Sequence, residues 1–204
     1  MNFNKKDQVN NSFEMIKTKI KFLSNKNKMN TFVITSTRHD SGKTLCASRL
    51  ANTLASDKDK VLLVDANFYH SDLHRLYNLD NSVGLSDLVN DSSINYKDIV
   101  HKIDNSNLYI LTSGGKAENI ADLMYTDNFA RFMEIIANEF DYVIFDTPSV
   151  LPDKSEAIVL GQMTCGLIIV VPLGKEKMSD LDSLALHAKN SGVKIIGAIY
   201  NENK

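Results

Sequence analysis

The chain contains no tryptophan, only three prolines and only two cysteines among its 204 residues. Cys46 and Cys165 are isolated in apolar sequence, which excludes a disulfide framework and favours two reduced core thiols in a cytosolic protein. With 43% hydrophobic and 24% charged residues, the composition also excludes collagen-like, coiled-coil and disordered chains. One ordinary globular domain remains, long enough to bury a full core without a structural metal.

A long apolar run is also missing. No stretch approaches the roughly 18 to 20 apolar residues that are needed to cross a bilayer. The first residues are not followed by the apolar core of a secretory signal. We therefore expect a cytoplasmic chain that does not span a membrane by itself.

Positive and negative side chains nearly cancel, since 23 are basic and 25 are acidic. Residues 1–30 are nevertheless basic, with seven lysines against Asp7 and Glu14. This basic end indicates either a solvated leader or a surface that faces an acidic partner.

Short β-branched runs alternate along the chain with helical patterns. Several runs are apolar at consecutive positions, which is typical of parallel strands covered by helices on both faces. The sequence predicts strands over 31–36, 61–65, 108–112, 142–146, 167–172 and 195–200, and helices near 43–56, 127–139, 154–163 and 176–191. This order predicts an α/β fold, a doubly wound and mostly parallel sheet flanked by helices, with ligands outside the carboxyl ends of the strands.

The segment before the first strand has a different pattern. Phe13, Ile16, Ile20 and Leu23 recur at helical spacing and predict an amphipathic helix over 11–23, with Lys17 and Lys21 on the solvent side, followed by a polar linker over 24–30. We therefore divide the chain into residues 1–30, an N-terminal helix and linker, and residues 31–204, a nucleotide-binding domain.

The strongest local motif is Thr35-Ser-Thr-Arg-His-Asp-Ser-Gly-Lys-Thr44, which follows a predicted strand and opens a predicted helix. This is the context of a P-loop, with Thr37 in place of its first glycine. Gly42 lets the backbone approach a phosphate, Lys43 reaches the β- and γ-phosphates, and the Thr44 hydroxyl can bind Mg²⁺. The motif predicts a P-loop NTPase that binds ATP or ADP with Mg²⁺.

Two acidic residues end predicted strands, Asp65 after Val61-Leu-Leu-Val and Asp146 after Tyr142-Val-Ile-Phe. An Asp after a strand is commonly a turn or cap residue. Beside a P-loop, however, such carboxylates are placed to hold magnesium and to offset charge during phosphoryl transfer. The predicted catalytic residues are therefore Lys43, Asp65 and Asp146, and the predicted metal ligands are Thr44, Asp65 and Asp146.

In this order the motifs resemble those of the bacterial tyrosine kinase family, the cytoplasmic kinase modules of capsule and exopolysaccharide assembly. That family groups with the Min and Par ATPases among P-loop proteins with deviant Walker motifs. Besides the P-loop, the resemblance rests on Val61-Leu-Leu-Val-Asp-Ala-Asn67, Gly84-Leu-Ser-Asp-Leu88, Asn107-Leu-Tyr-Ile-Leu-Thr-Ser-Gly114, Asn119-Ile-Ala-Asp-Leu123, Asp141-Tyr-Val-Ile-Phe-Asp-Thr-Pro-Ser149 and Ile196-Gly-Ala-Ile-Tyr-Asn201. These segments cover most of the chain.

The resemblance implies transfer of the ATP γ-phosphate to protein tyrosine, with polysaccharide export as the regulated process. It also implies a membrane adaptor protein as activator, so the chain would lie at the inner face of the cell membrane through this partner. No contact with nucleic acid is expected. The predicted nucleotide-binding residues are Arg38, His39, Asp40, Ser41, Gly42, Lys43, Thr44, Leu45 and Asn201, the last beside the adenine base.

Several positions depart from the family pattern. Asn67 replaces the second Asp of the Asp-x-Asp motif, and Tyr69 and His70 replace the basic residues that usually follow. If the missing carboxylate serves as general base, its loss reduces the rate by roughly 10²- to 10⁴-fold. Asp40 stands where the loop often carries Gly, so its carboxylate is expected to turn outward or to weaken ATP binding.

Two regulatory features are also altered. The family's N-terminal helix carries a Glu-x-x-Arg-x-x-Arg pattern for ring assembly, and Asn11, Glu14 and Lys17 stand at these positions. Lysine cannot make the bidentate contacts of arginine, so oligomerisation of the family type is doubtful. The last thirty residues hold one tyrosine, Tyr200. The acceptors to consider instead are Tyr69, Tyr77, Tyr96 and Tyr125.

Three functions therefore stay open. The first is a tyrosine kinase with full or weak activity, and the second is a nucleotide-binding regulatory module that has lost phosphoryl transfer. The third is a positioning ATPase like the Min and Par proteins, since Arg38 occupies the position of their signature lysine.

Overall fold

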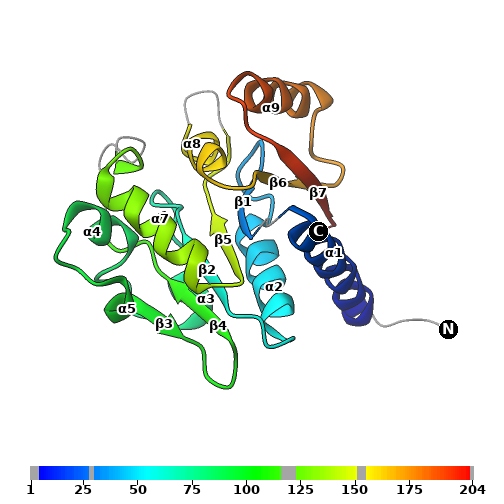
Figure 1. Ribbon diagram of the computed structural model, residues 1–204. Helices are drawn as coiled ribbons and strands as arrows, with labels where there is room; N and C mark the ends of the chain where they lie inside the picture. Colours follow the sequence, from blue (N-terminus) through cyan, green and yellow to red (C-terminus); the bar gives the residue numbers. More distant parts are fainter. Residues whose placement is uncertain (1–4, 28–29, 116–122, 151–154, 203–204) are drawn as a thin grey trace.

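The computed structural model describes residues 5–27, 30–115, 123–150 and 155–202. A seven-stranded sheet crosses the molecule in the order β3-β4-β2-β5-β1-β6-β7 (Figure 1). All neighbouring strands pair in parallel except β3 and β4, which are antiparallel. The strands are β1 (Thr31–Thr35), β2 (Val61–Asp65), β3 (Val100–Lys102), β4 (Leu108–Leu111), β5 (Tyr142–Asp146), β6 (Leu167–Pro172) and β7 (Ile195–Asn201). The predicted doubly wound, mostly parallel sheet is confirmed.

The long helices also lie where the sequence predicts them. They are α2 (Lys43–Ala55), α7 (Asp127–Glu139), α8 (Glu156–Met163) and α9 (Met178–Asn190). Residue 154, the predicted start of α8, lies outside the described residues. The sequence pattern missed β3 and three short helices, α3 (Leu73–Tyr77), α4 (Leu85–Asn90) and α5 (Tyr96–Ile99). These elements are too short to establish a hydrophobic period of their own.

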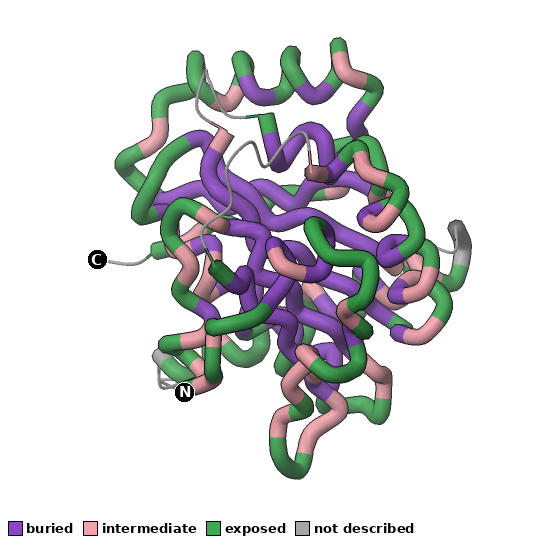
Figure 2. The backbone as a smooth tube through the Cα atoms, turned by 90° about the vertical axis from the view of Figure 1, so that its left-hand side faces the viewer, coloured by how far each residue is buried: buried purple, intermediate pink, exposed green. Residues whose placement is uncertain are grey.

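Consecutive strand residues contribute to two separate cores, one on each face of the sheet. Val33, Leu62 and Phe145 pack with α4, α7 and α8, whereas Phe32 and Leu63 pack with α1 and α2. In Figure 2 the buried backbone runs through the centre of the molecule and the exposed segments form its outline. Since both faces are covered, the central strands need apolar residues at every position.

The N-terminal helix α1 (Lys5–Asn27) extends beyond the predicted 11–23, so part of the predicted linker is helical. It packs against α2 through Phe13 and Ile20, which are buried in the core on that face. The prediction that Lys17 lies on the solvent side was wrong, because this side chain is only 7% exposed. No helix within the described ranges combines the length and the hydrophobicity needed to span a bilayer.

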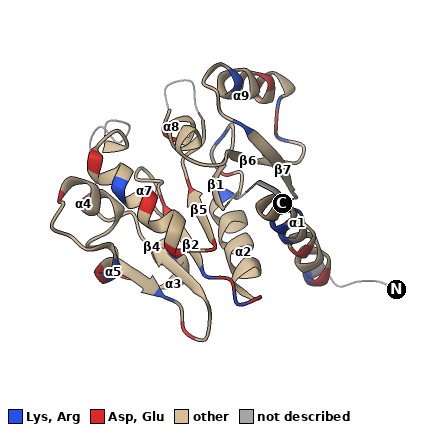
Figure 3. Cartoon of the chain, viewed as in Figure 1, with Lys and Arg blue, Asp and Glu red and all other residues tan. Residues whose placement is uncertain are grey.

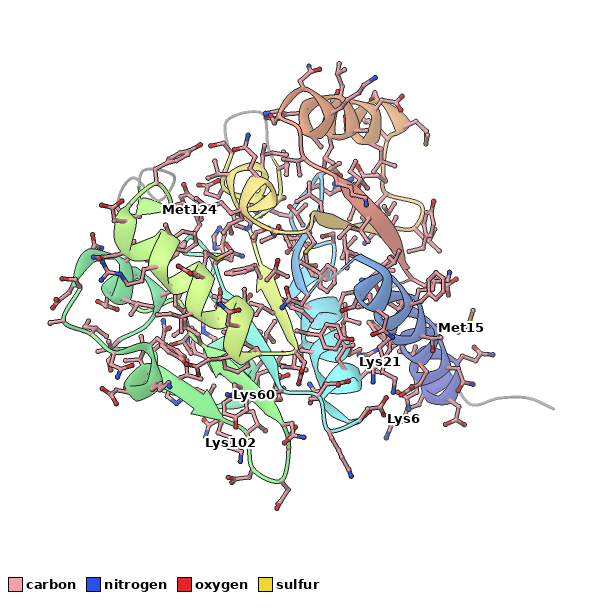
Figure 4. All side chains as sticks on the ribbon, in the orientation of Figure 1. Lys6, Met15, Lys21, Lys60, Lys102 and Met124 are labelled. Atoms are coloured by element: carbon pink, nitrogen blue, oxygen red, sulfur yellow. The ribbon has the colours of Figure 1, made fainter. Side chains whose placement is uncertain are left out.

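Ion pairs explain the burial of Lys17. Its ammonium lies 2.6 Å from Glu14 and 3.2 Å from Asp57, and the ammonium of Lys21 lies 2.9 Å from Asp57 and 2.6 Å from Asp59. Figure 3 shows both signs of charge along α1 and at the bend between α2 and β2, and Figure 4 shows Lys21 on the side of α1 that faces α2, opposite Met15. The hydrogen bonds that the Lys21 ammonium donates to Asp59 and Asp57 raise the pKa of Lys21 despite the opposing effect of burial. The basic helix is therefore attached to its own domain by charge as well as by packing.

Two glycine-containing motifs of the family pattern lie against each other at the end of β4. The backbones of Gly84 and Gly114 approach so closely that a Cβ on Gly84 would lie 2.2 Å from the Gly114 nitrogen. The Leu85 amide donates to the Thr112 carbonyl at 2.9 Å, and the Asp87 carboxylate accepts from the Gly84 amide at 2.8 Å. The close approach requires glycine at position 84, and it fixes one wall of the site described below.

Gly84→Ala should destabilise the protein by roughly 1–3 kcal/mol, because the added methyl group meets backbone that cannot rotate away. The matched control is Gly197→Ala, where a Cβ would have open space around it. Urea unfolding of both variants measures the difference. Equal stability of the two variants would contradict the close packing of the two motifs.

Candidate nucleotide-binding site

The loop between β1 and α2 has the geometry of a phosphate-binding loop. Gly42 caps α2 with φ 79° and ψ 25°, a left-handed conformation that glycine adopts without steric cost. The helix that it opens has thirteen residues, and the free N–H groups of its first turn point toward the loop. The loop therefore presents positive potential where the sequence predicts a phosphate.

The two substituted loop positions are both compatible with this geometry. Thr37 is not among the described non-glycine residues with positive φ, so its backbone does not need the glycine that P-loops usually carry there. Asp40 does have a left-handed backbone, with φ 55°. Aspartate tolerates this region better than most residues, although glycine adopts it at lower cost. The Asp40 side chain is exposed and lines the cleft.

The loop is held against neighbouring strands by buried hydrogen bonds. The Thr35 hydroxyl donates to the Pro148 carbonyl at 2.9 Å, and the Val150 amide donates to the Ser36 carbonyl at 2.7 Å. The loops after β1 and β5 are thus joined directly. The segment after Asp146 therefore supports the phosphate-binding loop through its backbone.

Asp65 and Asp146 stand opposite each other in the register of β2 and β5. Asp65 is fully buried and accepts hydrogen bonds from the Ser71 hydroxyl at 2.9 Å and from the amides of Asn67 and Leu73, each at 3.1 Å. Burial nevertheless raises the pKa of Asp65 above its usual range, and these donors oppose the rise. Asp65 therefore both ends the strand and organises the loop that follows.

Asp146 has a different environment. Within the described part of the chain, neither of its buried carboxylate oxygens has a hydrogen-bond partner. Burial, followed by repulsion from Asp65, raises the pKa of Asp146 to about 7, while Thr44 and Lys43 lie close enough to favour its charged form. A buried carboxylate without a donor, beside a second carboxylate and a hydroxyl, fits the oxygen ligands that Mg²⁺ prefers. Thr44, Asp65 and Asp146 would hold the ion.

A cleft of about 920 Å³ opens outside these strand ends. Among the predicted nucleotide-binding residues, six line it: His39, Asp40, Gly42, Lys43, Thr44 and Leu45. The other lining residues come from the loop after β2 with α3, and from the wall at Asn81 and 113–115. Gly114 donates its amide to the Asn81 side-chain oxygen at 3.0 Å, which fixes this wall. The cleft is large enough for a nucleotide.

Three predicted residues do not line the cleft. The Arg38 guanidinium donates to the Lys175 carbonyl, and Ser41 is buried with a hydroxyl that has no partner within the described residues. The Asn201 amide donates to the Ser41 carbonyl at 2.8 Å. The expected contact of Asn201 with adenine stays a prediction, and the structure gives this side chain a role in holding the loop.

Asn67, the residue in place of the second Asp, is 8% exposed and lines the cleft. Its side-chain oxygen accepts from the His70 amide at 3.3 Å. The side chain therefore shapes the turn after β2. An amide cannot accept a proton at neutral pH, so Asn67 does not supply a general base.

Sequence reasoning missed one contact at the cleft. Tyr69, which lines the cleft, donates its hydroxyl to the Glu156 carboxylate at 2.7 Å. Glu156 is 5% exposed at the start of α8, and its second oxygen has no partner within the described residues. The sequence does contain one indication of this contact, because the acidic residue Glu156 directly precedes the apolar run Ala157–Leu160.

The fold and the site define a P-loop nucleotide-binding domain. A family model described as an AAA domain matches residues 29–185. Tyrosine-protein kinase YwqD of Bacillus subtilis is 31% identical over 94% of this chain and 80% of its own length, and the putative tyrosine-protein kinase CapB of Staphylococcus aureus is 26% identical over 97% and 86%. The chain belongs to the bacterial tyrosine-protein kinase family.

Other relatives are much longer. The chain is 27% identical to tyrosine-protein kinase ptk of Acinetobacter johnsonii over 98% of its own length, but it spans 27% of that relative. Among solved structures, the kinase domain of Escherichia coli tyrosine kinase ETK superposes with a TM-score of 0.88 at 26% identity, covering 94% of this chain and 74% of that one. Pyrococcus horikoshii MinD with Mg-ADP, at a TM-score of 0.69 and 22% identity, covering 85% and 70%, shares the fold.

Asp146→Asn should remove a pH dependence from the stability of the metal-free protein. Because the folded-state pKa of Asp146 lies above its unfolded value, the folded protein holds an extra proton, and stability falls as pH rises toward 7. In EDTA, the free energy of unfolding of the unmodified chain should fall by about 2 kcal/mol more than that of the variant between pH 5 and pH 8. Urea unfolding at both pH values measures this difference.

Asp182→Asn, on the exposed side of α9, controls for the loss of one acidic group and should behave like the unmodified chain. If Asp146→Asn keeps the same pH dependence as this control, the two buried carboxylates do not oppose each other as described.

Proposed function

We propose that the chain is an ATP-dependent protein-tyrosine kinase module that acts in capsular or exopolysaccharide synthesis and export. The observation that carries the proposal is the pair of strand-end carboxylates, Asp65 and Asp146, opposite each other beside a phosphate-binding loop. The names of the relatives support the kinase assignment, and CapB and ETK cover nearly all of this chain. That this chain shares the activity and the partners of its longer relatives is part of the proposal.

The residues of the site divide the work of phosphoryl transfer. The N–H groups at the start of α2 and the Lys43 ammonium hold the phosphates, and Thr44, Asp65 and Asp146 would hold Mg²⁺. The bound ion would neutralise charge on the phosphates during transfer. With Asn67 in place of a carboxylate, the proton of the acceptor tyrosine has no base at this position, so the proposed activity is weak. The second candidate, a regulatory module without transfer, follows from the same residue.

Burial and hydrogen bonding reduce the number of tyrosines that can accept phosphate. Tyr77 is bonded through its hydroxyl to Ser48 and Asn52, and Tyr96 is 7% exposed and bonded to Glu139. Three tyrosines are more exposed: Tyr69 at 49%, although its hydroxyl donates to Glu156, Tyr125 at 65% and Tyr200 at 68%. We propose that phosphate transferred in cis or in trans goes to these.

The partner proposal is a membrane adaptor of polysaccharide export, which would bring the chain to the inner face of the membrane. Ring assembly through the N-terminal helix is not part of it, because Glu14 and Lys17 pair with each other and Lys17 also pairs with Asp57 of the same chain. We also propose that the chain divides into residues 1–30 and residues 31–204.

The alternative function, a positioning ATPase like the Min and Par proteins, is disfavoured. Arg38, at the position of their signature lysine, contacts the Lys175 carbonyl and does not line the cleft.

Lys43→Met should lower the transfer of label from γ-labelled ATP to tyrosine by at least about 100-fold, because the phosphates lose their nearest cation. The assay uses the full chain with and without the cytoplasmic segment of its adaptor. Lys102→Met, an exposed lysine on β3, is the matched control and should keep the unmodified rate. Label on tyrosine that is equal in Lys43→Met and in the control would sink the kinase proposal.

Asn67→Asp should raise the rate of tyrosine phosphorylation by about 100-fold, the lower end of what a general base contributes. The structure permits the change, since a carboxylate can accept from the His70 amide as the Asn67 oxygen does. Asn67→Ser, which removes the amide without adding a base, should show no gain. An unchanged rate in Asn67→Asp, with Mg-ADP binding intact, means that position 67 does not limit catalysis.

A further inference from the structure

Two histidine rings from different loops meet at the cleft. His39 belongs to the phosphate-binding loop, and His70 belongs to the loop after β2. Their ring centroids lie 5.7 Å apart with perpendicular planes, and both side chains are exposed and line the cleft. The contact brings together two segments that both border the region where a bound nucleotide's phosphates would lie.

The charged side chains that line the cleft nearly cancel one another. Apart from histidines, the charged side chains that line it are Lys43 and Arg75 against Asp40 and Asp72. Arg75 is paired with Asp72 at 3.2 Å. With neutral histidines the lining therefore has no net positive side-chain charge to offset a polyphosphate. Protonated histidines would supply it, since imidazole is the side chain that changes charge near neutral pH.

We propose that His39 and His70 form a proton-linked phosphate-binding pair, each donating an N–H to a phosphate oxygen of the bound nucleotide. Two imidazolium rings this close repel each other, so the ligand-free protein disfavours protonating both. An anion beside the pair that accepts an N–H from each ring offsets the repulsion. Nucleotide binding and proton uptake are thereby coupled. The inference rests on the proposed nucleotide binding and adds two residues and their protons to it.

The other ionisable groups around the pair determine the size of the coupling. Asp40 follows His39 in the chain and favours its charged form, whereas Lys43 and Arg75 oppose it. His74 is directed elsewhere, because its Nδ1 lies 3.1 Å from the Ser71 hydroxyl, which itself donates to Asp65. Tyr69 and Asp72 complete the ionisable lining of the cleft.

The sign of the pH dependence follows directly. A bound phosphate favours the charged form of both rings, so nucleotide affinity should be highest at low pH and should fall as pH rises. A nucleotide's own phosphates gain negative charge as pH rises, which acts in the opposite direction. Weaker binding at higher pH is therefore attributable to the protein.

Calorimetric titration of the full chain with Mg-ADP tests the pair. Because Mg²⁺ displaces the proton that Asp146 holds in the ligand-free protein, the contribution of the histidines is measured as a difference. At pH 7, titrations in two buffers of different ionisation enthalpy should show the unmodified chain taking up roughly 0.5 to 1.5 more protons per nucleotide than the double variant of His39→Gln and His70→Gln. Each single variant should remove part of this difference, and the double variant should still bind at pH 8.

His187→Gln, an exposed histidine on α9, is the matched control and should keep the full uptake. Binding with equal proton exchange in the unmodified chain and in the double variant overturns the inference and leaves the nucleotide site standing. Absence of Mg-ADP binding by the unmodified chain at every pH removes the proposed function itself.

Discussion

The site depends on an unfavourable interaction, the placement of Asp65 and Asp146 side by side inside the protein. Burial and, after it, repulsion from Asp65 raise the pKa of Asp146, which shows the cost of this placement. The sheet offsets this cost, since β1, β2 and β5 are buried along their whole length. A divalent cation would relieve the same repulsion.

The sequence predicted what repeats or clusters locally. The buried strands have runs of consecutive apolar residues, and the phosphate-binding loop has its residues in one segment, so both were found at the right positions. Contacts between distant segments carry no periodic signal, which is why Tyr69 with Glu156 and Asn201 with Ser41 emerged only from the structure. The wrong prediction for Lys17 has the same origin, because helical spacing cannot indicate that Asp57 lies opposite.

Two residues that depart from the family pattern, Asp40 and Asn67, fit the backbone at their positions. Asp40 adopts the left-handed backbone of the residue usually found there, and Asn67 accepts a backbone hydrogen bond that shapes its turn. Neither substitution distorts the loop that carries it. What the substitutions alter is the charge of the cleft, through one added carboxylate at Asp40 and one absent carboxylate at Asn67.

Asn201 links two parts of the molecule that the sheet alone would keep apart. It stands at the end of β7, the margin of the sheet, and its amide bonds the phosphate-binding loop that follows central β1. The outermost strand thus helps to hold the phosphate-binding loop in place. A substitution that moves the end of β7 would therefore also move the Ser41 carbonyl through this hydrogen bond.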